Sequence, residues 1–170
     1  GAVRMLFYGL SGTGKTEFAR YISESLGKEL LLKRASDIFD KYVGGTEQNI
    51  AAAFEEAAKN DQILLFDEAD SFFSDRKNAE RNFERTQVNE FLTQLEEFPG
   101  IVICTTNLRN IMDPAMLRRF HITVDFKALT EEGVKKLLEK FFSDYAFSEK
   151  LIHRLCAYDS VTPGDFGKLS

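Results

Sequence analysis

Short apolar runs alternate along this chain with segments in which apolar residues recur at helical spacing. In residues 47–60, Ile50, Ala53, Phe54 and Ala57 fall at positions i, i+3, i+4 and i+7, the spacing of one buried helix face. This alternation predicts βαβ units and therefore an α/β fold with a central parallel sheet flanked by helices. The predicted strands are Val3–Tyr8, Glu29–Lys33, Gln62–Phe66, Ile101–Thr105 and Ile122–Phe126. The predicted helices are Lys15–Leu26, Glu47–Asn60, Glu84–Phe98 and Glu131–Phe142.

The strand signal stops after about Leu129, and only helical patterns follow. This change predicts an α/β nucleotide-binding core over residues 1–128 and part of a small helical lid subdomain over residues 129–170, cut off at Ser170. The chain also begins almost inside its first apolar run. We therefore expect it to be a fragment of a longer protein, with residues preceding Gly1.

Composition and charge narrow the functional classes. Apolar residues make up 44% of the 170-residue chain, which is enough for a packed core. No apolar run reaches the roughly 18 residues that a membrane span needs. The 22 basic and 27 acidic residues give a net charge of −5, which argues against a broadly basic nucleic-acid surface. Cys104 and Cys156 form no disulfide framework, and Cys104 lies in an apolar run typical of a buried side chain, so we expect a reduced, cytoplasmic setting.

A glycine-rich loop follows the first predicted strand. Residues 9–16, Gly-Leu-Ser-Gly-Thr-Gly-Lys-Thr, fit the phosphate-binding pattern G-x-x-x-x-G-K-[ST], in which glycines let successive N–H groups point at one anion. Lys15 would reach the β- and γ-phosphates of ATP, and the Thr16 hydroxyl would ligate Mg²⁺. A turn without a ligand is the alternative, but the strand before and the helix after favour phosphate binding. The predicted nucleotide-binding residues are Gly9, Ser11, Gly12, Thr13, Gly14, Lys15, Thr16 and Asp67.

The third predicted strand ends in acidic residues. Ligands of open α/β sheets bind at the carboxyl ends of strands, so Asp67 is placed to join Thr16 in the Mg²⁺ shell. Glu68 is placed to polarise the attacking water, and Asp70 is a candidate structural acid. Alone, these acids would be an ordinary surface turn; after a phosphate loop they favour catalysis. Residues 67–70 also spell the DEAD box of RNA helicases, but no Ser-Ala-Thr motif ends the later strand, so we interpret this match as coincidence.

A strand-tip amide and two adjacent arginines extend this set. Asn107 ends the fourth predicted strand beside the acids, where an amide can orient water and sense phosphate; as a lone residue it would be a turn former. Pro114 after Asp113 predicts a helix start, and Arg118 and Arg119 follow it. Such arginines form either a solvated face or a finger that neutralises transition-state charge, and spacing alone does not choose between the two.

The order of these motifs resembles that of the AAA+ ATPases, and within them the AAA clade of katanin- and spastin-like remodelling enzymes. Residues 36–44 are similar to that clade's first pore loop, residues 88–95 to its helix after the acidic motif, and the likeness is strong over Val3–Phe126. It implies a P-loop NTPase that hydrolyses ATP, forms homo-oligomeric rings, often hexamers, and remodels or unfolds a protein substrate. By this resemblance, Glu68 activates water, Asn107 is the first sensor, Arg118 and Arg119 act on the neighbour's nucleotide, and Lys41, Tyr42 and Val43 form the substrate pore loop.

The pore-loop assignment has a packing alternative. Phe39 and Val43 lie at helical spacing with Tyr42, which would also suit a core aromatic. The flanking Lys41 and Gly44 favour an exposed loop.

Other segments match the clade less well. By analogy, the charged residues 75–85 form a second pore loop. Residues 162–165, Thr-Pro-Gly-Asp, stand where the clade often has a Gly-Ala pair, and Gly45-Thr46 stands where many members have an acid and a small residue. The upstream segment that commonly helps to hold adenine in this family is absent from the sequence.

Two other functions use the same loop. A P-loop kinase would transfer phosphate to a small molecule, but it would carry its arginines in a closing lid and needs neither a pore loop nor a strand-tip Asn. A DNA-associated loader or initiator module is the second alternative, and the sequence around Tyr42 favours a protein substrate instead.

Overall fold

A parallel sheet forms the centre of the protein. The computed structural model describes residues 1–73, 82–108, 114–141, 147–156 and 161–167. The sheet has five strands in the order β2-β3-β4-β1-β5, and every neighbouring pair is parallel. The strands are β1 (Val3–Gly9), β2 (Leu30–Arg34), β3 (Ile63–Asp67), β4 (Ile101–Thr106) and β5 (Ile122–Phe126). The predicted α/β fold is confirmed, and each predicted strand end lies within one residue of the observed one.

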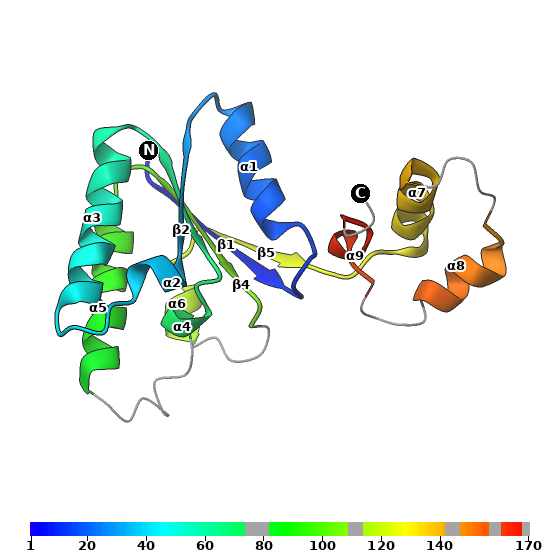
Figure 1. Cartoon of the computed structure of the whole chain (residues 1–170). Helices are drawn as coiled ribbons and strands as arrows, with labels where there is room; N and C mark the ends of the chain where they lie inside the picture. The colour runs from blue at the N-terminus through cyan, green and yellow to red at the C-terminus, as the bar shows by residue number, and fades with distance from the viewer. Residues whose placement is uncertain (74–81, 109–113, 142–146, 157–160, 168–170) are drawn as a thin grey trace.

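Helices cover both faces of this sheet (Figure 1). The four predicted helices are observed, with starts up to two residues earlier than expected. Short helices that the periodicity does not predict join them. The helices of the described residues are α1 (Lys15–Ser25), α2 (Ala35–Ile38), α3 (Gly45–Lys59), α4 (Asp70–Phe73), α5 (Asn82–Glu97), α6 (Pro114–Leu117), α7 (Glu131–Phe141), α8 (Glu149–Cys156) and α9 (Pro163–Gly167).

Strand alternation divides the core into two layers. Leu64 and Phe66 point to the face covered by α3 and α5, whereas Ile63 and Leu65 point to the face covered by α1. All four side chains have zero exposure because β3 lies inside the sheet and is covered on both sides. Asp67, which ends β3, and Glu68, which follows it, are therefore held by a strand that is packed on both faces.

Aromatic rings fill the layer under α3 and α5. Phe91 on α5 lies 5.1 Å from Phe66 and 4.6 Å from Phe72, measured between ring centroids. Phe72 is also stacked on Phe39 at 5.1 Å. Phe39 therefore packs against this layer, while the chain beyond it turns outward.

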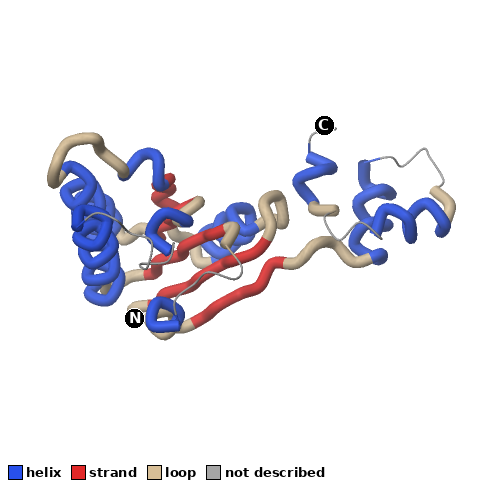
Figure 2. The backbone as a smooth tube through the Cα atoms, turned by 90° about the horizontal axis from the view of Figure 1, so that it is seen from below, coloured by secondary structure: helices blue, strands red, loops and turns tan. Residues whose placement is uncertain are grey.

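The last three helices have a core of their own. Val134 and Leu138 of α7 pack with Ile152 of α8 and Phe166 of α9. Figure 2 shows these helices set apart from the sheet, beyond the end of β5. This arrangement agrees with a small helical lid, while the division at residue 128 stays a prediction.

Candidate active site

The glycine-rich loop lies at the carboxyl end of β1, as predicted. Gly9 has φ +143°, and a Cβ atom there would meet the Phe126 carbonyl oxygen at 2.0 Å, so the contact between β1 and β5 requires glycine. Gly14 caps α1 with φ +94°, and the helix begins at Lys15. The first N–H groups of α1 therefore open toward the loop.

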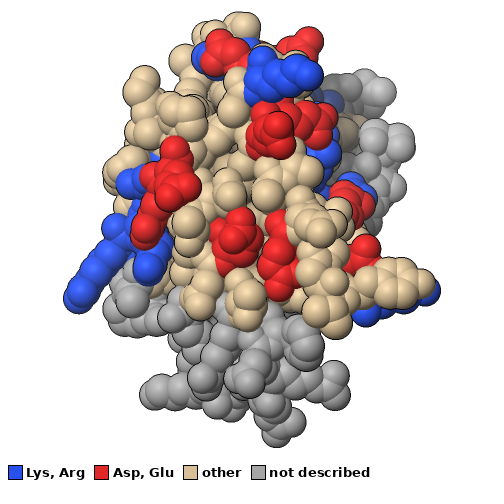
Figure 3. Space-filling view, turned by 90° about the vertical axis from the view of Figure 1, so that its left-hand side faces the viewer, with Lys and Arg blue, Asp and Glu red and all other residues tan. Residues whose placement is uncertain are grey.

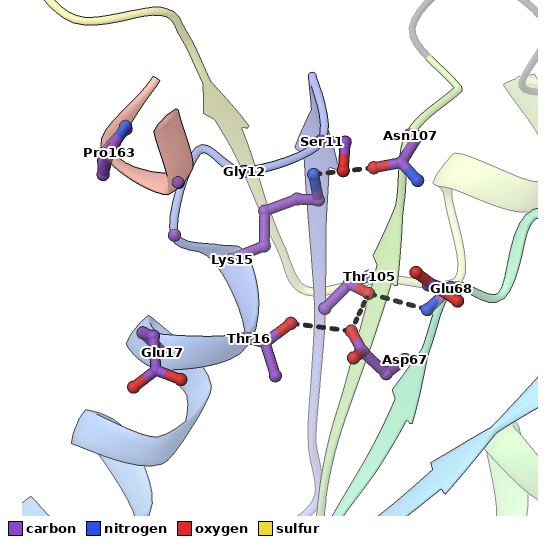
Figure 4. A pocket seen from close by; sticks show the side chains of 12 residues that line it. Ser11, Gly12, Lys15, Thr16, Glu17, Asp67, Glu68, Thr105, Asn107 and Pro163 are labelled. Carbon is purple, nitrogen blue, oxygen red and sulfur yellow. Dashed lines mark hydrogen bonds between the residues drawn. The ribbon is translucent and has the colours of Figure 1, made fainter. Parts of the chain in front are cut away.

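Lys15 connects the loop to β4. Its Nζ donates hydrogen bonds to the carbonyl oxygens of Gly9 and Leu10 at 2.8 and 2.7 Å. It also donates to Oδ1 of Asn107 at 2.9 Å (Figure 4). Only 7% of Lys15 is exposed, so its charge lies inside the site rather than in bulk solvent. The structure thus brings the predicted phosphate lysine and the predicted sensor amide into direct contact.

A pocket of about 370 Å³ opens in front of the loop, a volume that suits a small ligand. It is lined by Ser11, Gly12, Gly14, Lys15, Thr16, Glu17, Asp67, Glu68, Thr105, Asn107, Pro163 and Gly164. Thr13 is buried and donates its hydroxyl to the Leu10 carbonyl at 2.7 Å.

The helical segment after β5 supplies one wall of this pocket through Pro163 and Gly164. The Gly164 N–H donates to the Gly12 carbonyl at 2.9 Å, so α9 touches the phosphate loop directly. The side chain of Asp165 accepts hydrogen bonds from Thr162 and fixes this turn. In the sequence, residues 162–165 stand out only as a departure from the clade's Gly-Ala pair, and nothing local in them indicates this long-range contact.

Thr16 and Asp67, the residues predicted to hold Mg²⁺, are of the types that this ion prefers as ligands. Thr16 donates its hydroxyl to Oδ1 of Asp67 at 2.9 Å, and only 8% of Asp67 is exposed. One hydroxyl and one carboxylate suit Mg²⁺, which usually completes its shell with phosphate oxygens and water. The described residues contain no group of three or more His, Cys, Asp or Glu side chains that would form an all-protein metal site.

Glu68 and Asn107 face the same pocket from adjacent strands. Glu68 is exposed and has φ +57°, a left-handed conformation that is uncommon for a residue with a side chain. The Asn107 N–H donates to Oδ1 of Asp70 at 2.9 Å, and the Thr106 hydroxyl donates to the same oxygen. Asp70 is therefore the structural acid that the sequence suggested, since it holds the tip of β4.

Arg118 and Arg119 lie at the other end of the sheet. They precede β5, whereas the phosphate loop follows β1, and these two strands are parallel neighbours. β1 has seven residues, which separates its two ends by about 20 Å at about 3.3 Å per residue. Arg119 pairs with Glu96 at 2.6 Å between Nε and Oε1, while Arg118 is exposed. The structure does not bring either arginine to this chain's own pocket.

The predicted pore loop is exposed. Tyr42 is 69% and Val43 81% exposed, so the packing alternative for Tyr42 is wrong. Lys41 Nζ lies 5.0 Å from the centre of the Tyr42 ring. Asp40 accepts the Tyr42 N–H at 2.9 Å, which gives the loop a defined turn.

Two further predictions depend on residues that the structure describes only in part. Residues 75–81 of the expected second pore loop lie outside them, and the side chains of residues 82–85 do as well. Within the described part of the chain, no helix is both long enough and apolar enough to cross a membrane.

Comparison with known proteins agrees with this geometry. Residues 5–128 match the family described as "ATPase family associated with various cellular activities (AAA)". The 26S proteasome subunit RPT4 of Saccharomyces cerevisiae is 35% identical over 123 residues, which cover 67% of this chain and 28% of that protein. The chain thus spans well under a third of this relative's length. Because the family match covers well over half of the chain, the chain belongs to the AAA family of ATPases.

Proposed function

We propose that the pocket binds ATP with Mg²⁺ and hydrolyses the γ-phosphate. The observation that carries this proposal is the convergence on one pocket of side chains from the start of α1 and the ends of β3 and β4: Lys15, Thr16, Asp67, Glu68 and Asn107. In phosphoryl transfer the protein mainly positions groups and offsets charge, and these side chains are of the types that this needs.

Each residue has a separate role in the proposed reaction. Lys15 and the N–H groups of the loop bind the phosphate oxygens. Thr16 and Asp67 would hold Mg²⁺, which when bound offsets charge on the β- and γ-phosphates. Glu68 accepts a proton from the water that attacks phosphorus, as the bond to the leaving ADP oxygen breaks. Asn107 orients that water or the γ-phosphate from the tip of β4.

We further propose a homo-oligomeric ring, hexameric as in the resembling clade. The support is the position of Arg118 and Arg119, which stand about 20 Å from their own loop along β1. A neighbouring copy can receive them at its nucleotide, where an arginine finger would neutralise transition-state charge. The same position argues against a kinase, whose arginines would close over their own site.

The substrate proposed for this ring is a polypeptide, remodelled as by katanin- and spastin-like enzymes. The exposed pair Tyr42 and Val43 supports this, since an aromatic and an aliphatic side chain suit an extended peptide. The similarity to a proteasome subunit also favours a protein substrate. Figure 3 shows acidic side chains spread over the face where α3 lies, with basic ones toward its borders, so the described residues of this face form no broadly basic surface for nucleic acid.

Glu68→Gln tests the proposed reaction. ATP binding should persist and phosphate release should fall by about 10²-fold or more, since the amide cannot accept the proton. Glu24→Gln on the exposed side of α1 is the matched control and should hydrolyse ATP like the parent. Hydrolysis by Glu68→Gln at the parent rate would remove Glu68 from this role. Phosphate transfer to an added acceptor instead of water would favour the kinase.

A further inference from the structure

Thr105 lies beside Asp67 at the acidic end of β3. Strands β3 and β4 are parallel, with Phe66 opposite Cys104, so the next pair is Asp67 and Thr105. Both side chains point to the face covered by α1, because Leu65 and Ile103, two residues earlier, pack there. Thr105 is 1% exposed, and a fully buried hydroxyl needs polar partners.

The hydroxyl of Thr105 finds two such partners. It donates to Oδ1 of Asp67 at 2.6 Å and accepts the N–H of Glu68 at 3.0 Å. The Thr105 carbonyl accepts the next N–H, that of Ala69, at 2.9 Å. Figure 4 shows the resulting chain of hydrogen bonds from Thr16 through Asp67 and Thr105 to the Glu68 backbone.

Glu68 depends on this support. Its left-handed φ of +57° costs free energy relative to extended backbone, and such a conformation persists only where its surroundings hold it. Within the described residues, the Glu68 carboxylate has no hydrogen bond or ion pair, so its direction follows from the backbone. The two N–H groups that Thr105 accepts lie on either side of the Glu68 side chain along the chain.

We propose that Thr105 is a positioning residue, which fixes the magnesium acid Asp67 and the base Glu68 relative to each other through one hydroxyl. The inference rests on the proposed function, since it assigns an effect on the step that Glu68 performs. A displacement of about 1 Å at a reacting group can cost about 10²-fold in rate.

Thr105→Val removes the hydroxyl and keeps the shape and the strand preference. Hydrolysis should show kcat lower by about 10- to 100-fold with the KM for ATP within about threefold, because the loop contacts are unchanged. Thr105→Ser restores the hydroxyl and should return kcat to within about threefold of the parent. If the valine variant loses cooperative unfolding, Thr105→Ala makes the same test with a smaller side chain. Ser23→Ala is the control, because Ser23 is another buried hydroxyl, donating to the Lys28 carbonyl far from the pocket.

A double-mutant cycle separates positioning from a structural role. In the Glu68→Gln background, Thr105→Val should lower the residual rate by a clearly smaller factor than in the parent, since the base is already gone and only the effect on Asp67 remains. Equal losses in both backgrounds, or an unchanged kcat in Thr105→Val alone, would overturn the proposal. If Glu68→Gln itself hydrolyses ATP at the parent rate, the proposed function fails, whatever Thr105→Val does.

Discussion

The ring of Phe91 should carry a large share of the stability of the α/β core. It has zero exposure and lies within 6.2 Å of four other rings, centroid to centroid: Phe54, Phe66, Phe72 and Phe73. Phe91→Ala leaves a cavity that these rings cannot all fill. The expected loss in free energy of unfolding is about 4 kcal/mol, within the usual range for a buried Phe. This expected loss in free energy of unfolding includes the loss of the stacking of Phe91 on Phe72.

Urea unfolding followed by circular dichroism measures this loss. With a denaturant slope of about 2 kcal/mol per molar, 4 kcal/mol lowers the midpoint by roughly 2 M. Phe18→Ala is the matched control, since Phe18 also contacts rings but is 41% exposed. Its expected cost is about 1.5 kcal/mol, because less apolar surface is buried.

The comparison of these two variants tests the two-layer core. A midpoint for Phe91→Ala at or above that of Phe18→Ala would refute the reasoning, because the ring under α5 would then contribute less than a half-exposed one. The effect should also reach the active site. Phe72 lies on α4, which begins at Asp70, so loosening its stacking partner should weaken the hold of Asp70 on Asn107.

Two further predictions concern the paired arginines and the cysteines. Arg118→Ala should abolish hydrolysis without changing thermal stability. Arg119→Ala should also lower the free energy of unfolding by about 0.5–1 kcal/mol, because the variant loses the partly exposed ion pair with Glu96. Equal melting temperatures of the two variants would contradict this difference in stability. Burial raises the pKa of the Cys104 thiol, so alkylation of the folded protein should modify Cys156 alone. The pKa of Cys156 is itself raised, by desolvation and then by the charge of Glu131, so Glu131→Gln should speed its alkylation at mildly alkaline pH, measured by intact mass.

The sequence predicted the elements that have strong local signals. Four of the strands are largely apolar runs, β5 alternates apolar and polar residues, and α3 carries its buried residues at helical spacing, so these signals need no long-range information. The helices α2 and α4 have four residues each, which is too short for a periodic signal. α2 is held by the contact of Asp37 with the Arg34 N–H, and α4 by the packing of Phe72.

The candidate site likewise contains residues that local sequence signals predict and one residue, Thr105, that they do not. Lys15, Thr16, Asp67 and Glu68 were predictable because motif and strand end lie together in the sequence. Thr105 was not, because its role depends on the register of β3 against β4, which places it opposite Asp67. A polar residue inside an apolar strand was the available signal, but without the register it could equally have faced the other layer.

The same topology that gathers the phosphate site also separates it from the arginines. Strands that all run in one direction place the residues after β1, β3 and β4 at one edge and the residues before β5 at the other. The helical segment after β5 also reaches the loop, through the contact of Gly164 with Gly12. Residues 161–167, which make that approach, include no basic side chain. Among the described residues that line the pocket, Lys15 is the one basic side chain, so on the proposed mechanism a finger from a neighbouring copy would add a second one. If the proposed ring forms, hydrolysis would depend on assembly, because the strand direction keeps Arg118 and Arg119 away from this chain's own pocket.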